Sequence, residues 1–258
     1  MPTRAAVLGR PISHSLSPRL HRAAYAALGL DWTYDAVDCG PDELPAFLAG
    51  LGSEWAGLSL TMPLKQAVLP LLDSVSDLAR DVAAANTVVL RDGRRHGENT
   101  DVHGIVAALA SAGVTRAERA VVLGGGATAR SALAALKQLG CTSPVLVVRS
   151  EPVETLAAAE RLGMTPSVVS ELPRECDLLV STLPAGAADR FAPYVRDVPA
   201  LLDVVYDPWP TALAEACGGV VVSCAAMLLH QAAEQVRLMT GFEPPVRVMQ
   251  QALPALKG

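Results

Sequence analysis

Residues 119–140 read RAVVLGGGATARSALAALKQLG. A short apolar run ends in three glycines, and an alanine-rich segment with helical spacing follows at once. Gly124, Gly126 and Ala129 fit the GxGxxG/A pattern, in which a strand leads through a phosphate-binding turn into a helix. A tight turn without a ligand would also use glycine, but the strand and helix on either side favour dinucleotide binding. The expected phosphate-binding residues are Gly124, Gly125, Gly126, Ala127 and Thr128.

The next expected strand, PVLVVRS, indicates which dinucleotide binds. It ends in Arg149 and Ser150, at the place where an acidic residue would bind the ribose 2′-hydroxyl of NAD. An arginine there suits the 2′-phosphate of NADP, although Glu151 follows and a surface arginine is the alternative interpretation. The sequence therefore predicts NADP as the cofactor, with NAD as the alternative.

Strand and helix signals alternate along the whole chain, which is typical of an α/β fold with parallel sheet. Strands are expected at 4–9, 32–39 and 56–62, and an Asp92-Gly93 turn predicts a hairpin over 87–99. A helix over 17–30 should have Ser17 as its N-cap, and a last helix should lie near 247–256. The pattern restarts near residue 102. We predict two domains: residues 1–101, with helices of about 226–258 packed back on them, and a Rossmann-like dinucleotide-binding domain over 102–225.

Composition excludes several classes of protein. Hydrophobic residues make up 51% of the 258 and charged residues 18%, so a large core can form. A net charge of −5 without a basic cluster argues against nucleic acid as a partner. The longest uncharged run, 216–233, contains polar residues and is expected to be buried protein rather than a membrane span. Five cysteines without CxxC spacing predict reduced thiols, no zinc site and a cytoplasmic location.

Candidate substrate-side residues lie in the first hundred positions. Lys65 follows an apolar strand and is one of only three lysines among 21 basic residues, and lysine can release a proton where arginine cannot. Ser15 and Ser17 stand at a helix start, where hydroxyls and the helix dipole would favour a carboxylate. A solvated lysine and ordinary helix capping are the alternatives. Asp101 by itself would also be explained as a helix cap.

Eight segments in order resemble the shikimate dehydrogenase family, and they cover nearly the whole chain. They are GRPISHSLSP (9–18), GLSLTMPLK (57–65), AANTV (84–88), GENTDVHG (97–104), GGGATARSA (124–132), STLPAG (181–186), DVVYDPWPT (203–211) and MLLHQAA (227–233). The resemblance implies NADPH-dependent reduction of 3-dehydroshikimate to shikimate, in chorismate and aromatic amino acid biosynthesis. It also implies that residues 1–101 form the substrate-binding and catalytic domain.

Site residues are implied position by position by the same resemblance. Lys65 and Asp101 would be the catalytic pair, and Ser15 and Ser17 would hold the substrate carboxylate. The other substrate-binding positions are Thr61, Asn86, Tyr206 and Gln231. Gly124 to Thr128 would hold the pyrophosphate, and Arg149 with Ser150 the 2′-phosphate. Asp77, Val204 and Cys224 occupy positions that lie near the cofactor in the family.

Departures from the family pattern leave two alternatives open. The signature for NADP is shortened to Val148-Arg149-Ser150, and no second basic residue follows in Pro152-Val153-Glu154. Cys224 replaces a glycine next to the expected nicotinamide position. One alternative is a quinate or dual quinate/shikimate dehydrogenase, for which NAD is a candidate cofactor. The other is a non-catalytic NADP-responsive binding protein, whose expected mark would be the loss of Lys65 or Asp101. A homodimer is compatible with the sequence.

Overall fold

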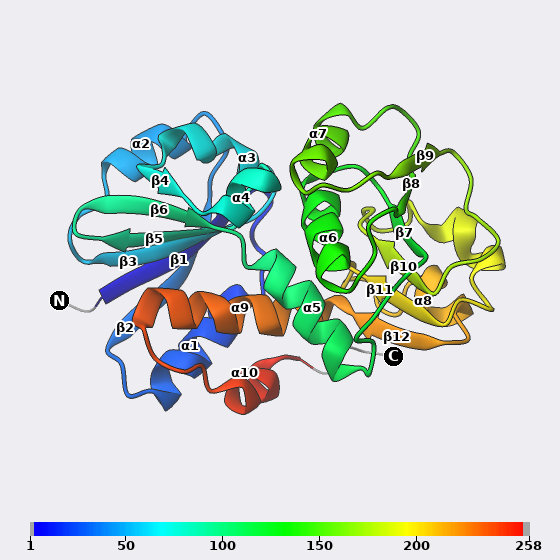
Figure 1. The fold of residues 1–258 in the computed structure, drawn as a ribbon. Helices are drawn as coiled ribbons and strands as arrows, with labels where there is room; N and C mark the ends of the chain where they lie inside the picture. Colours follow the sequence, from blue (N-terminus) through cyan, green and yellow to red (C-terminus); the bar gives the residue numbers. More distant parts are fainter. Residues whose placement is uncertain (1–2, 255–258) are drawn as a thin grey trace. The chain divides into compact units, whose positions relative to one another are not determined.

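The computed structural model describes residues 3–254, which divide into two compact units. The first unit contains residues 3–100 and 228–254, and the second contains residues 101–227. Each unit has its own six-stranded sheet with helices packed on it (Figure 1). The α/β class expected from the sequence is confirmed. The expected C-terminal helix is α10 (Val246–Ala252), and the parts of the predicted ranges over 1–2 and 255–258 lie outside the described residues.

The sheet of the first unit is mixed. Its strands are β1 (Thr3–Gly9), β2 (Trp32–Asp38), β3 (Trp55–Leu60), β4 (Ser74–Val75), β5 (Thr87–Arg91) and β6 (Arg94–Glu98), in the order β2-β1-β3-β5-β6-β4. Strands β1, β2 and β3 are parallel, whereas β5 runs antiparallel to both of its neighbours. Asp92 and Gly93 join β5 to β6 with φ of 53° and 71°, as the predicted two-residue hairpin requires.

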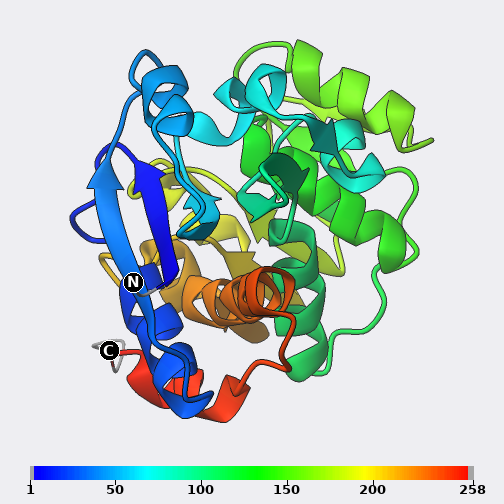
Figure 2. The ribbon, with the colours of Figure 1, turned by 90° about the vertical axis from the view of Figure 1, so that its left-hand side faces the viewer.

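Alternate residues of β1 fill two different cores. Ala5 and Val7 belong to a cluster with residues of α1 (Ser17–Ala27), α9 (Cys224–Thr240) and α10. Ala6 and Leu8 belong to a second cluster with residues of α2 (Leu44–Ala49) and α3 (Leu64–Ala67). The period of two along a strand explains why both faces of this sheet are covered. Helix α10 packs beside α1, as Figures 1 and 2 both show.

The sheet of the second unit is entirely parallel. Its strands are β7 (Ala120–Leu123), β8 (Val145–Val147), β9 (Ser167–Val169), β10 (Leu178–Ser181), β11 (Ala200–Asp203) and β12 (Val220–Ser223). The order β12-β11-β10-β7-β8-β9 means that the chain builds outward from β7 in one direction and from β10 in the other. Ligands of such sheets bind at this reversal, beyond the carboxyl ends of the two central strands.

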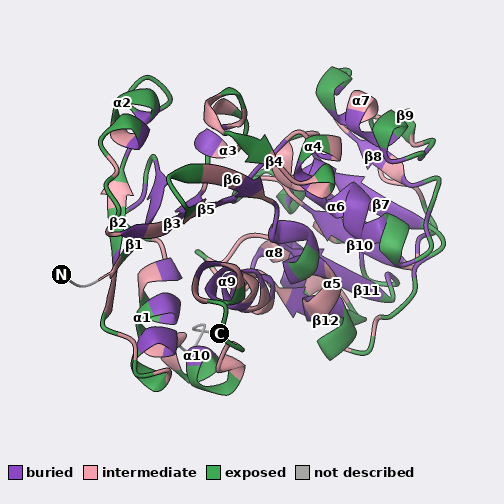
Figure 3. Ribbon diagram, turned by 60° about the vertical axis from the view of Figure 1, so that its left-hand side comes forward, coloured by how far each residue is buried: buried purple, intermediate pink, exposed green. Residues whose placement is uncertain are grey.

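Helices cover this parallel sheet, and its central strands are buried (Figure 3). The helical elements are α5 (Asp101–Ser111), α6 (Ala127–Gln138), α7 (Val153–Arg161), α8 (Ala212–Ala216) and the 3-10 segment η2 (Asp189–Tyr194). Of the described helices in either unit, none has the length and apolar character needed to cross a membrane.

Helix α1 corrects one prediction. Ser17 is not the N-cap but the first helical residue, because the helix begins one residue earlier than the capping rule indicates. Pro18 therefore occupies the second helical position, which tolerates proline because a first-turn N–H has no partner within the helix. The Ser15 hydroxyl accepts the backbone N–H of Ser17 at 3.3 Å. Ser15, rather than Ser17, thus supplies a hydroxyl to the helix start.

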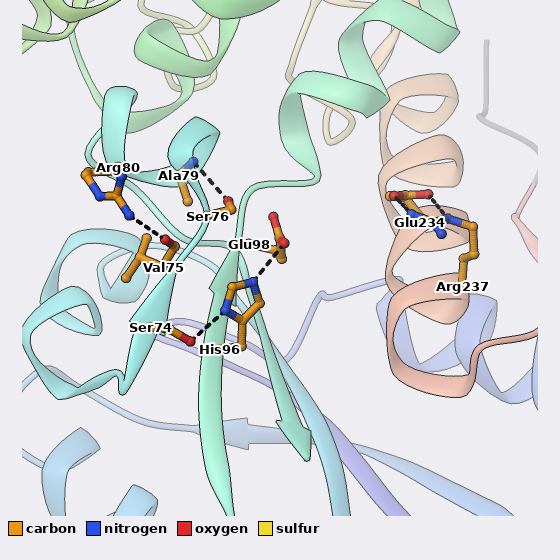
Figure 4. Close-up of polar contacts among 9 residues, drawn as sticks. All are labelled: Ser74, Val75, Ser76, Ala79, Arg80, His96, Glu98, Glu234 and Arg237. Carbon is orange, nitrogen blue, oxygen red and sulfur yellow. Dashed lines mark hydrogen bonds and ion pairs between the residues drawn. The ribbon is translucent and has the colours of Figure 1, made fainter. Parts of the chain in front are cut away.

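Helix α4 (Asp77–Asp81) was not expected from the sequence, and one hydroxyl caps it. The Ser76 Oγ accepts the Ala79 N–H at 3.2 Å, and the Arg80 guanidinium reaches back to the Val75 carbonyl oxygen at 2.9 Å (Figure 4). We expect Ser76→Ala to lower the free energy of unfolding by about 1 kcal/mol, the usual value of such a cap. Urea denaturation measures it, with Ser53→Ala in an exposed turn as control. An equal loss in both variants would contradict the capping role.

Candidate active site

The glycine loop after β7 has a backbone that only glycine suits. Gly124 has φ of +108°, and a Cβ on it would lie 2.5 Å from the Thr182 hydroxyl. The hydroxyl of Thr155 donates to the Gly125 carbonyl oxygen at 2.7 Å and fixes the loop from the side of α7. At Gly126 no atom lies within 4 Å of a Cβ position, so the space at the N-terminus of α6 is open. Backbone N–H groups of a first helical turn attract anions.

A cavity of about 630 Å³ opens beside this loop. Of the predicted cofactor residues, Gly124, Gly125, Arg149 and Ser150 line it. The remaining lining residues are Val148, Glu151, Pro152, Val153, Glu154, Leu183, Pro184, Ala187 and Arg190. The wall therefore combines apolar side chains with two guanidinium groups and two carboxylates. An adenine ring can pack against the apolar side chains, and a phosphate group can bind to the guanidinium groups.

One of these carboxylates has a buried partner that the sequence did not indicate. Arg130 of α6 has only 1% of its side chain exposed, and its Nη1 lies 3.3 Å from Glu154 Oε2. Burial lowers the pKa of Arg130, and the charge of Glu154 opposes that shift. The ion pair joins α6 to α7 and compensates the charge of Glu154 at the edge of the cavity. The cavity, the open helix N-terminus and the arginines together fit a dinucleotide with a 2′-phosphate.

The other predicted cofactor residues lie outside the lining of this cavity. Ala127 and Thr128 form the first turn of α6. Val204 follows β11 and donates its N–H to the Ser181 carbonyl at 3.1 Å, and Cys224, which forms no disulfide, begins α9. Asp77 belongs to the first unit, where its exposed carboxylate accepts from Arg80 at 2.6 Å.

Two of the predicted substrate-binding residues, Asn86 and Gln231, are buried amides of the first unit that contact each other. Asn86 is 1% exposed and Gln231 7%, and the Asn86 Nδ2 donates to Gln231 Oε1 at 3.3 Å. The Asn86 Oδ1 accepts the Thr100 N–H at 2.7 Å and the Thr87 hydroxyl at 2.9 Å. The Gln231 Nε2 donates to the Leu228 carbonyl at 3.1 Å. These hydrogen bonds hold both amides in one orientation.

A second polar network lies directly behind Asn86, and none of its members was predicted from the sequence. The Gln235 Nε2 donates to the Asn86 carbonyl at 3.2 Å and to the Thr87 hydroxyl at 2.9 Å. Its Oε1 accepts the Ser59 hydroxyl at 2.8 Å and lies 3.2 Å from His21 Nε2. Gln235 therefore ties α1, β3 and β5 to α9 at one point.

Aromatic rings complete this network. The His21 ring stacks on Tyr34 with centroids 4.0 Å apart, and the Tyr34 hydroxyl donates to Ser59 Oγ at 2.5 Å. Burial lowers the pKa of His21 to about 3 and raises that of Tyr34, which also bonds to the Ser17 side chain. His21 is therefore a neutral imidazole with a structural role. It contacts Gln235, which bonds to Asn86, and Tyr34, which bonds to Ser17.

The remaining predicted substrate residues belong to both units. Thr61 follows β3, and its N–H donates to the Leu8 carbonyl at 2.9 Å. Lys65 lies half-buried in α3, and its carbonyl accepts the N–H of Ala85, next to Asn86, at 2.8 Å. In the second unit, Asp101 is 4% exposed at the start of α5, where the helix dipole favours a carboxylate. Burial raises the pKa of Tyr206, which follows β11.

The parallel sheet and its glycine loop define a Rossmann-like dinucleotide-binding protein, joined in one chain to a second α/β unit that carries buried amides and a lysine. Residues 7–88 match the family model of the shikimate dehydrogenase substrate binding domain, and residues 226–253 that of the shikimate 5′-dehydrogenase C-terminal domain. The chain belongs to the shikimate dehydrogenase family.

Individual relatives agree with this assignment over nearly the whole chain. A curated shikimate dehydrogenase (NADP(+)) of Thermus thermophilus is 38% identical, over 96% of this chain and 97% of its own. The crystal structure of Mycobacterium tuberculosis shikimate dehydrogenase is 42% identical with a TM-score of 0.90, covering 99% of this chain and 100% of that one. The Thermus thermophilus enzyme in complex with NADP(H) and shikimate is 36% identical with a TM-score of 0.86, covering 97% and 98%.

Proposed function

We propose that this protein is an NADP-dependent shikimate dehydrogenase, which reversibly reduces 3-dehydroshikimate to shikimate in aromatic amino acid biosynthesis. The observation that carries the proposal is the cavity at the reversal of the parallel sheet, where the glycine loop and Arg149 lie together. The identity of the substrate is inferred from membership of the shikimate dehydrogenase family. The five cysteines all lie in residues 3–254 and form no disulfide there, which supports a reducing compartment such as the cytoplasm.

The first unit, which includes the helices α9 from Leu228 and α10, takes the substrate in this proposal, and the second unit takes the cofactor. Ser15 and Ser17 at the start of α1 hold the carboxylate, which the positive end of the helix dipole also favours. Asn86 and Gln231 bind ring hydroxyls through the amides that their neighbours orient. Thr61 and Tyr206 complete the substrate-binding set.

Lys65 and Asp101 perform the proton chemistry. NADPH, when bound, supplies the hydride that reduces the substrate ketone. The ammonium group of Lys65 stabilises the negative charge that develops on the carbonyl oxygen and donates the proton that this oxygen needs. Asp101 is the second member of this catalytic pair. In the oxidation of shikimate the same pair accepts the proton.

Absorbance at 340 nm tests the proposal, with purified protein and shikimate in parallel assays containing NADP or NAD. We expect rapid reduction of NADP and much slower reduction of NAD, because Arg149 has a phosphate to bind only in NADP. Quinate in place of shikimate is the control for substrate class, and a faster rate with quinate would favour a quinate dehydrogenase. No reduction under any condition would overturn the proposal and favour an NADP-responsive binding protein.

A further inference from the structure

The cavity beside the glycine loop contains a second arginine from a part of the chain with no recognised motif. Arg190 is the second residue of η2, which follows β10, whereas Arg149 follows β8. Strands β8 and β10 are the two neighbours of β7, which leads into the glycine loop. Both arginines line the same cavity of about 630 Å³. The cationic wall of this cavity is therefore built from both sides of the central strand.

The segment that presents Arg190 is anchored in the core. Phe191 is 5% exposed and packs in a cluster with Val195, Leu201 and Leu213. The Arg190 Cζ lies 4.5 Å from the centroid of the Phe191 ring. A ring face orients a guanidinium without using its N–H donors, so these donors remain available for a ligand.

An acidic residue in the cavity wall means that one arginine alone would attract a phosphate only weakly. Glu154 is paired with buried Arg130, but Glu151, two positions after Arg149, lines the same cavity. Within residues 3–254, no ion pair of either Arg149 or Arg190 is found. A phosphate dianion beside Glu151 is repelled by that carboxylate, and one arginine only offsets the repulsion. Two guanidinium groups give the site a net attraction for the dianion.

We propose that Arg190 is a specificity-determining residue that binds the 2′-phosphate of NADP together with Arg149. It takes the place of the second basic residue that the segment after Arg149 lacks. The inference rests on the proposed function, because it concerns the same cofactor cavity. The segment that follows Arg149 lacks a second basic residue, and Arg190 of η2 supplies that positive charge in its place. A preference for NADP is therefore compatible with the shortened motif.

Binding of cofactor fragments tests this role without turnover. Isothermal titration calorimetry compares 2′,5′-ADP, which carries the 2′-phosphate, with 5′-AMP, which lacks it. Arg190→Met keeps the aliphatic stem over Phe191 and removes the charge. We expect the variant to bind 2′,5′-ADP about tenfold more weakly, the effect of one lost charged hydrogen bond, and to bind 5′-AMP within twofold of the unchanged protein. The kcat/KM for NADP should fall by a similar factor, and that for NAD should not.

Arg174→Met is the matched control, because Arg174 is an exposed arginine of the same unit that does not line the cavity. It should change neither affinity, and thermal unfolding without ligand checks the folding of both variants. If Arg190→Met binds 2′,5′-ADP as the unchanged protein does, or weakens 5′-AMP equally, the inference is wrong while the proposed function stands. If the unchanged protein shows no preference for 2′,5′-ADP and does not reduce NADP, both fail.

Discussion

Replacing Lys65 with methionine is expected to lower the turnover number at least about 100-fold and to leave the KM for shikimate within a few-fold. Protonation of the developing alkoxide is a transition-state event, so the loss of its donor affects kcat rather than the binding of the ground state. Methionine keeps the length and apolar stem of lysine but offers no proton. The carbonyl of Lys65 bonds to Ala85 through the main chain, so the substitution leaves that link in place.

Initial rates of NADP reduction with saturating shikimate measure this effect. Lys137→Met is the matched control, because Lys137 is an exposed lysine in the last turn of α6 and should tolerate the change without loss of activity. Fluorescence titration with NADPH checks that the cofactor site of the variant is intact. An unchanged turnover number for Lys65→Met would exclude Lys65 as the proton donor.

Local pattern was enough to predict the elements that place the cofactor. The apolar run, the three glycines and the alanine-rich segment over 119–140 gave β7, the loop and α6, because each depends on neighbours in sequence. The Asp92-Gly93 hairpin was predictable for the same reason. The Asn86–Gln231 pair was not a local feature: 145 residues separate the two amides, and only the family resemblance indicated both.

Residues whose roles depend on tertiary contacts could not be predicted from local sequence patterns. His21 and Gln235 are 214 positions apart, and nothing in either segment shows that an imidazole and an amide will meet. Arg190 lies in a 3-10 segment without periodicity or a motif, so its place in the cofactor cavity depends on the packing of Phe191. Arg130 stands in the buried, alanine-rich part of α6, where an ion pair with Glu154 compensates its charge.

The buried His21 is expected to make the stability of the protein depend on pH. Its pKa is lowered from 6.5 to about 3 because burial disfavours the imidazolium ion, and the bond to Gln235 opposes this only in part. The groups around the ring are Tyr25, Tyr34 and Gln235, and burial raises the pKa of both phenols, so these neighbours are neutral. None of them supplies a negative charge that would favour protonation.

The folded state thus releases a proton that the unfolded chain binds below pH 6.5. The stabilisation from a neutral His21 is complete above that pH and is lost progressively as the pH falls toward 3. At pH 5 the loss is about 2 kcal/mol, since one unit of pKa difference corresponds to about 1.4 kcal/mol. Urea denaturation at pH 8 and pH 5, followed by circular dichroism, measures the difference in the free energy of unfolding.

His21→Phe isolates this contribution from that of the carboxylates. Phenylalanine can keep the stack on Tyr34 but does not titrate, so the variant should lose about 2 kcal/mol less than the unchanged protein between pH 8 and pH 5. At pH 8 it should be the less stable of the two, because the hydrogen bond to Gln235 is gone.

The control is His103→Gln, on the exposed side of α5, which should retain the full pH dependence. An identical pH dependence in His21→Phe and the unchanged protein would mean that the folded protein accommodates a charged His21. In that case the hydrogen bond from Gln235 to the Asn86 carbonyl would persist whether His21 is neutral or protonated.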